Sequence, residues 1–310
     1  MRSCLLIISL CIACACRAGD DLGLRKDSLS SKPDSARTYR HRIRTIAIAG
    51  TTVYTGTMIG LYNLWYRNYP QSKFHFFNDN NEWQDMDKFA HATTSYYLGR
   101  LGYKTFRWAG VSENKATWIG GLSGSAFLTI VEILDGFSAQ WGASPGDLTA
   151  NTFGSALFIS QQLAWHEQKV LLKYSFHPTS FADYRPDLLG KNIGQQIIKD
   201  YNGHTYWLSV NLNSFAGRDS RIPHWLNVAA GYHATGMTGA VTNVSSYKGN
   251  PIPAFKRETL FYIAPDIDLT RIRTHSAALK WIFEAIGFLK FPLPALEISG
   301  HGMKFKPLYF

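Results

Sequence analysis

Ionisable residues at helical spacing stand out in two otherwise apolar stretches of the 310-residue sequence. Asp87 and His91 are four residues apart and therefore share one face of a helix. Glu132 and Asp135 are three apart and share a face in the same way. Carboxylates together with one imidazole can bind Mg²⁺, Mn²⁺ or Zn²⁺. The sequence therefore offers a candidate divalent-cation site, whose predicted ligands are Asp87, His91, Glu132 and Asp135.

The second pair of carboxylates lies where a helix disfavours negative charge. Gly136 is typical of a helix end, so Glu132 and Asp135 fall in the last turn, where the helix dipole opposes each anion by about 0.3–1 kcal/mol. These carboxylates require a cation, whether a lysine, a histidinium or a metal. Lys88 offers one such counter-charge. His91 has two open interpretations, a hydrogen-bonded core histidine or a group that binds a ligand or transfers protons.

A third polar group opens the next predicted helix. Ser144 precedes a proline and stands three residues before Asp147, which is typical of a helix N-cap. Asn151, one turn further, requires a buried hydrogen-bonding partner or a polar pocket. Together these positions form a predicted polar network: Asp87, Lys88, His91, Glu132, Asp135, Ser144, Asp147 and Asn151. Four of them are candidates for acid–base catalysis, namely His91, Glu132, Asp135 and Asp147.

The spacing of apolar residues predicts the elements that carry this network. Helical patterns cover four stretches: 45–66, 86–101, 115–134 and 144–167. Strand-like alternation follows in 200–215, 224–237, 259–270 and 295–310, with an amphipathic helix over 275–288. We therefore expect an α+β fold, with an N-terminal bundle of about four apolar helices followed by a small antiparallel β-rich region with one helix. The predicted domains are a helical domain, 45–190, and a β-rich region, 191–310.

Composition limits the class of protein. A hydrophobic fraction of 45% and a charged fraction of 17% exclude a disordered or collagen-like chain. A mean hydropathy of −0.14 argues against a polytopic inner-membrane transporter. All four cysteines lie within the first sixteen residues, in an apolar segment that follows Arg2. That layout is typical of a secretory signal peptide.

The predicted signal peptide covers residues 1–18. Its removal would take away Arg2 and Arg17, which lowers the net charge from +10 to +8 and leaves a chain without cysteine. Lipidation at Cys14 or Cys16 is the alternative, although neither cysteine follows a good lipobox.

Two segments follow the signal peptide. Residues 19–44 are polar and basic and are predicted to form a linker. Residues 45–66 carry no charge, and this length suits either a membrane-spanning helix or a core helix. Because an exported chain with a basic flank here conflicts with the positive-inside rule, we favour a core or outer-membrane-associated helix.

Three motifs in the helical half resemble a known family. D-K-x-x-H at 87–91, E-x-x-D-G at 132–136 and S-x-x-D-L-x-x-N-x-x-G at 144–154 resemble the YfiM-like family of predicted periplasmic lipoproteins, and distantly the VanZ-like membrane proteins. Three later blocks, DYNGHTYWLSVN, LNVAAGYHATGM and APDIDL, resemble longer members from Bacteroidota-type envelopes. The resemblance implies a periplasmic location and marks the polar network as the family's signature, but it implies no activity.

The sequence lacks the motifs of several common enzyme classes. The sequence has no Walker A motif, no dinucleotide-binding glycine fingerprint, no nucleophile elbow and no HExxH zinc motif. An exported basic chain does not meet nucleic acid, so its expected partners are an anionic lipid or lipopolysaccharide surface and an envelope protein.

Two functions stay open. The first is a non-catalytic protein of the periplasm or outer membrane, in which Lys88 and His91 neutralise Glu132 and Asp135. The second is a metal-assisted hydrolase or transferase acting on an envelope lipid or glycan, with a divalent cation held by the predicted ligands. We favour the first, because Lys88 is a ready counter-charge and the sequence shows no evident nucleophile.

Overall fold

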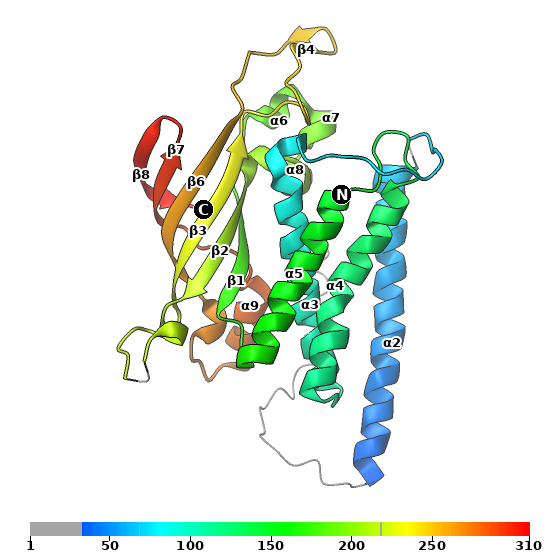
Figure 1. Cartoon of the computed structure of the whole chain (residues 1–310), viewed down its shortest axis with the longest axis vertical. Coiled ribbons are helices and arrows are strands. Elements are labelled where there is room, and N and C mark those ends of the chain that lie inside the picture. The colour runs from blue at the N-terminus through cyan, green and yellow to red at the C-terminus, as the bar shows by residue number, and fades with distance from the viewer. Residues whose placement is uncertain (1–32, 68, 218) are drawn as a thin grey trace. The chain divides into compact units, whose positions relative to one another are not determined.

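The computed structural model describes residues 33–67, 69–217 and 219–310 (Figure 1). The predicted signal peptide and both candidate lipidation sites lie outside the described residues. The described chain forms two compact units, which we call the helical unit (33–77 and 94–166) and the sheet unit (78–93 and 167–310). The boundary between them falls inside one continuous helix, α3. The predicted α+β class, with helices in the N-terminal half and an antiparallel sheet after them, is confirmed.

Long helices dominate the first half of the chain. They are α2 (Pro33–Leu61), α3 (Met86–Trp108), α4 (Glu113–Asp135) and α5 (Pro145–Trp165), and α2 continues into a π-helical turn, η1 (Tyr62–Tyr66). Among the helices that the structure describes, only α4 has the length and apolar composition that a bilayer crossing needs, with a mean hydropathy of 1.4 and 39% of its apolar window buried.

Helix α2 begins inside the predicted linker. Residues 33–44 are helical, which corrects the linker prediction for this stretch. Arg42 Nη1 donates a hydrogen bond to the Trp108 carbonyl oxygen at 2.8 Å, and the guanidinium lies 4.9 Å from the indole centroid. Polar composition suggested a linker, but the basic residues stand on exposed positions of a helix whose start is held against the end of α3.

Small residues bring α3 and α4 into close contact. A Cβ atom added at Gly124 would lie 2.2 Å from the backbone oxygen of Ser95, and one added at Gly99 would lie 2.8 Å from the backbone oxygen of Gly121. Close backbone approach of this kind requires glycine. It also explains why α3 runs seven residues past its predicted end at Leu101, since packing against α4 offsets the helix cost of glycine.

The sheet unit contains a six-stranded antiparallel sheet with the order β1-β2-β3-β6-β7-β8. The strands are β1 (Val170–Phe176), β2 (His204–Asn211), β3 (Leu226–Thr235), β6 (Glu258–Ile267), β7 (Leu293–Ser299) and β8 (Gly302–Tyr309). Strand β1 lies within the predicted helical domain 45–190. It was not predicted, because a short apolar run does not distinguish a strand from a buried helix segment. The predicted helix over 275–288 is α9 (Ala277–Ile286).

Short elements precede α3 or connect the strands. They are α6 (Phe181–Tyr184), α7 (Pro186–Leu189), α8 (Ile193–Lys199), the hairpin β4–β5 (Ser246–Tyr247 and Asn250–Pro251), and the 3₁₀ turns η2 (Glu82–Asp85), η3 (Tyr201–Gly203), η4 (Asn213–Phe215) and η5 (Leu269–Arg271).

The sheet curls around an interior that holds polar side chains beside an apolar cluster of Trp207, Ala229, Tyr262, Ala264 and Ala295. Thr205 on β2 and Tyr309 on β8 have hydroxyl oxygens 3.0 Å apart, although three strands separate them in the sheet. Residues on the enclosed face include several fully buried polar side chains: Lys173, Thr205, Ser209, Asn227 and Asp266. Successive strand residues point to opposite faces, so the alternate positions form the outer face.

Candidate functional site

Hydrogen bonds fix the register of α3 against α5. Ser95 Oγ donates to the Asn151 carbonyl oxygen at 2.6 Å and lies 3.0 Å from Ser155 Oγ. Eight residues further along α3, Tyr103 Oη accepts a bond from Gln162 Nε2 at 3.1 Å, so the two helices run parallel. One turn before these contacts, position 91 of α3 and position 147 of α5 occupy the same level.

Helix α4 reaches that level from the opposite direction. Ser125 Oγ donates to the Asn151 carbonyl oxygen at 2.6 Å, and Gly121 packs against Ile159, so α4 is antiparallel to α5. Two turns further along α4, the backbone N–H of Ser144 donates to Glu132 Oε2 at 2.9 Å. The helix register therefore brings Glu132 to the start of α5.

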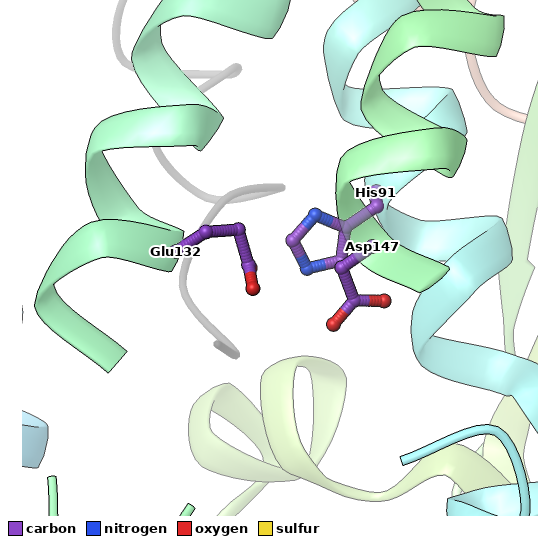
Figure 2. A group of neighbouring side chains, drawn as sticks. All are labelled: His91, Glu132 and Asp147. Atoms are coloured by element: carbon purple, nitrogen blue, oxygen red, sulfur yellow. The ribbon is translucent and has the colours of Figure 1, made fainter. Parts of the chain in front are cut away.

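Three side chains converge at this level. His91, Glu132 and Asp147 each offer a ligand atom, and these atoms all lie within 4.8 Å of one another. Figure 2 shows Glu132 pointing from its helix toward His91 and Asp147. Their exposed fractions are 2%, 1% and 1%. The sequence predicted His91 and Glu132 as ligands and Asp147 as a proton-transfer group, and the structure adds Asp147 to the ligand group.

Ser144 positions both carboxylates of this group. Its side-chain oxygen accepts a hydrogen bond from the Asp147 backbone N–H at 3.0 Å, which is the helix N-cap expected from the sequence. Its own backbone N–H holds Glu132. Asn151 lies one turn further along α5, and its side chain is buried. Its backbone carbonyl oxygen accepts the hydrogen bonds of Ser95 and Ser125 described above.

The electrostatics of the group centre on Glu132. Burial in a low-dielectric surrounding, with the nearby carboxylates of Asp147 and Asp135, raises the pKa of Glu132 to about 9. The Ser144 N–H bond opposes this shift. Burial and the neighbouring anions therefore disfavour the charged form of Glu132, which a nearby cation would favour.

Asp135 lies apart from the ligand group. Its Oδ1 accepts hydrogen bonds from Tyr66 Oη at 2.7 Å and from Trp141 Nε1 at 2.6 Å. Two neutral donors thus hold this buried carboxylate in the last turn of α4, where the sequence suggested a cation. The spacing of Glu132 and Asp135 did not reveal this, because Tyr66 lies 69 residues away in the sequence.

Asp87 and Lys88 belong to a second cluster. Lys88 Nζ lies 2.8 Å from Asp79 Oδ1 and 3.6 Å from Asp87 Oδ1. The ammonium of Lys88 thus supplies charge to carboxylates of its own segment, and its expected neutralisation of Glu132 and Asp135 stays a prediction. Asp79, Asp87 and Asp147 also offer ligand atoms within 4.8 Å of one another. Asp79 was missed, since it stands in an Asn-rich loop without helical spacing.

Comparisons with known proteins address the helical part of the chain. Residues 75–161 match the model of a family described as "Predicted periplasmic lipoprotein (DUF2279)". Every residue of the predicted polar network falls within this stretch. No curated protein and no solved structure matches the chain. The match supports an exported, periplasmic envelope protein and leaves the YfiM-like, VanZ-like and Bacteroidota resemblances as predictions.

Proposed function

We propose that this chain is an exported envelope protein with a non-catalytic, structural role, and that it lies against a membrane with its apolar exterior in contact with lipid acyl chains. The family match over residues 75–161 supports export to the periplasm. The observation that carries the membrane contact is the pattern of the sheet, which encloses charged and polar side chains and exposes apolar side chains on its outer face.

The outer face of the sheet is apolar along continuous rows of paired residues. One row crosses all six strands in register: Leu172, Leu208, Ala230, Ile263, Leu296 and Phe305. The next row is Tyr174, Tyr206, Tyr232, Phe261, Ile298 and Met303. Several members are exposed, including Phe261, Ile263, Met303 and Phe305. Phe89 of α3 already stacks on Tyr206 and Tyr232. A water-exposed sheet face is ordinarily polar, so the exposed part of the rows on β6 and β8 requires an apolar covering.

The enclosed face of the same strands holds charged and polar groups beside its apolar cluster. Lys173 Nζ and Asp266 Oδ2 form an ion pair at 2.7 Å, and both side chains are fully buried. Ser209 Oγ donates to Asp266 Oδ2 at 2.6 Å, and Asn227 Nδ2 donates to Ser209 Oγ at 2.8 Å. Polar-inside and apolar-outside alternation is typical of strands that face lipid.

The helical unit has the same pattern. Helix α4 exposes Trp118, Ile119 and Leu122, while Glu132 on the same helix is buried. On α5, Phe153 is exposed to 54%. An apolar exterior of this extent around a polar interior favours contact with acyl chains over contact with water.

Basic residues gather at one end of the helical unit, where the start of α2 meets the end of α3. They are Arg37, Arg40, Arg42 and Arg44 on α2, Arg100, Lys104 and Arg107 on α3, and Lys115 at the start of α4. Trp118 and Trp165 are exposed at the same end, which the Glu113–His166 contact of 3.0 Å brings together. Tryptophan and basic residues suit the head-group level of an anionic lipid or lipopolysaccharide surface.

The buried polar network supports the structural role. His91, Glu132 and Asp147 are almost fully enclosed, whereas a hydrolase needs a route for substrate to its metal-bound water. A metal-assisted hydrolase or transferase therefore remains the less favoured alternative.

Vesicle flotation of the full chain tests the proposal. The wild-type protein should float with vesicles that contain anionic lipid, and the double variant Phe261→Ser/Ile263→Ser should partition at least about 10-fold less, because two apolar side chains lose their transfer energy. The matched control is Val241→Ser, which changes an exposed apolar residue outside both rows and should float like the wild type.

Either of two results would contradict membrane contact. One is a wild-type protein that stays in the aqueous fraction, which would instead favour an envelope protein as the covering of the apolar rows. The other is equal flotation of the double variant and the wild type.

A further inference from the structure

We propose that His91, Glu132 and Asp147 bind one divalent transition-metal cation, of the Zn²⁺ or Mn²⁺ class, which ties α3, α4 and α5 together. This inference goes beyond the proposed function, because it does not depend on contact with a membrane. It rests on the convergence of the three side chains, on their burial and on the chemistry of the donor atoms.

The geometry of the group is close to that of a bound ion. Imidazole nitrogens and carboxylate oxygens bind zinc at about 2.0–2.2 Å, so two ligand atoms on one ion lie at most about 4.4 Å apart. The ligand atoms of His91, Glu132 and Asp147 already lie within 4.8 Å of one another. A shift of the ligand atoms by a few tenths of an ångström therefore brings them within the separation that one bound ion requires.

A divalent cation also suits the charge of the group. Glu132 and Asp147 are two carboxylates with exposed fractions of 1% each, and buried carboxylates are stable only when a proton or a cation compensates them. A divalent ion supplies both positive charges at once. His91 adds a neutral nitrogen donor, which favours zinc or manganese over magnesium and calcium.

The surroundings hold the ligands in place. Ser144 fixes Glu132 Oε2 through its backbone N–H and caps the helix that carries Asp147. Ser95, one turn from His91 on α3, bonds to the Asn151 backbone on α5. Partners that orient ligands in this way are characteristic of metal sites, and their loss typically lowers metal affinity 10–100-fold.

The neighbouring carboxylate group does not need a second ion. Asp79 and Asp87 share the ammonium of Lys88, at 2.8 Å and 3.6 Å. Asp147 belongs to both groups, so a metal beside it would lie next to the carboxylates that Lys88 pairs with.

Metal analysis of the purified full-length chain tests the site. After removal of metals with a chelator, the protein is dialysed against Zn²⁺, Mn²⁺ or Mg²⁺, and bound metal is measured by mass spectrometry. We expect about one Zn²⁺ or Mn²⁺ per chain and no retained Mg²⁺. Glu132→Gln and Asp147→Asn should each lower the affinity for Zn²⁺ at least about 100-fold, since each removes a ligand charge.

Asp135→Asn is the matched control. Asp135 is also a buried carboxylate of α4, but it bonds Tyr66 and Trp141, so its variant should bind Zn²⁺ within a few-fold of the wild type. Circular dichroism verifies that each variant folds.

The proposal is overturned if the wild-type chain retains no stoichiometric Zn²⁺ or Mn²⁺, which decides the matter even where a variant does not fold. It is equally overturned if folded Asp147→Asn binds as tightly as the wild type, or if Asp135→Asn loses as much affinity as Glu132→Gln. Flotation of the metal-free protein reports separately on the membrane proposal.

Discussion

The helical unit and the sheet unit both enclose charged side chains, but they compensate these charges by different means. In the sheet unit, Asp266 has the ammonium of Lys173 at 2.7 Å. In the helical unit, Glu132 and Asp147 are buried, and burial among carboxylates raises the pKa of Glu132 to about 9. The sheet unit thus carries its own counter-charge, whereas the helical unit buries two neighbouring carboxylates that a cation can bind.

The difference follows from the geometry of the two elements. Lys173 on β1 and Asp266 on β6 are separated by β2 and β3 in the sheet order, and the curl of the sheet brings the two charges together on its enclosed face. Close helix packing through glycine and serine leaves room for short side chains only, as at Gly124 beside Ser95. Four changes test this contrast, in order of decreasing expected effect.

Removing the internal counter-charge of the sheet should have the largest effect. Lys173→Met leaves Asp266 buried without its ammonium partner, which should lower the free energy of unfolding by about 3–5 kcal/mol. Urea unfolding followed by tryptophan fluorescence measures the loss. The double variant Lys173→Met/Asp266→Leu should recover most of it, and a single-variant cost below about 1 kcal/mol would show that the pair is not the source of stability.

A second buried lysine should make the stability of the sheet unit depend on pH. Burial, opposed by Asp266 and reinforced by Lys173, lowers the pKa of Lys290 to about 8, from an unfolded value of 10.5. Between these two pH values the unfolded chain binds the proton and the folded chain does not, so stability should rise with pH from about 8 to 10.5, by up to about 3 kcal/mol.

Lys290→Met provides the comparison for this pH dependence. Its free energy of unfolding should lack the rise between pH 8 and 10.5, when both proteins are measured by urea unfolding in the same buffers. Parallel pH profiles of the two proteins would assign the dependence to other groups.

Close helix packing should show a smaller but clear cost. In Gly124→Ala the new Cβ would lie 2.2 Å from the Ser95 backbone oxygen, so α3 and α4 must separate, which should lower stability by about 1–3 kcal/mol. Gly56→Ala on α2 meets no atom within 4 Å and should raise stability by about 1 kcal/mol through helix propensity. Thermal unfolding of both variants checks the opposite signs, and equal shifts would refute the close contact.

The smallest effect on stability is expected at the apolar exterior. Phe305 is exposed to 69%, so Phe305→Ser should change the free energy of unfolding in water by no more than about 0.5 kcal/mol. Its flotation with vesicles should nevertheless decrease. A large loss of folding stability would mean that Phe305 serves the core of the sheet unit.

Much of the fold could be predicted from local patterns. Periodicity placed α3, α4, α5 and α9 within a few residues of their starts, since each begins after a capping or turn residue. The alternation of β2, β3 and β6 was likewise visible. Strand β1 and the start of α2 could not be predicted, because a short apolar run and a basic polar run are each compatible with several structures.

The candidate site was only partly predictable. Helical spacing singled out His91 and Glu132. No local pattern in the sequence indicates that these two residues lie next to Asp147. Their convergence depends on the register that Ser95 and Ser125 set against α5. Asp135 also has the spacing of a ligand, but it accepts hydrogen bonds from Tyr66 and Trp141.

The sequence by itself determined the α+β order of elements and the set of carboxylates that need compensation, because periodicity and charge are properties of neighbouring residues. Only the tertiary structure decided which of these carboxylates meet an imidazole, which receive neutral donors and which pair with Lys88. The physical reason is that contacts between side chains on different helices depend on helix register. A shift of one residue turns a side chain by about 100° around its helix axis.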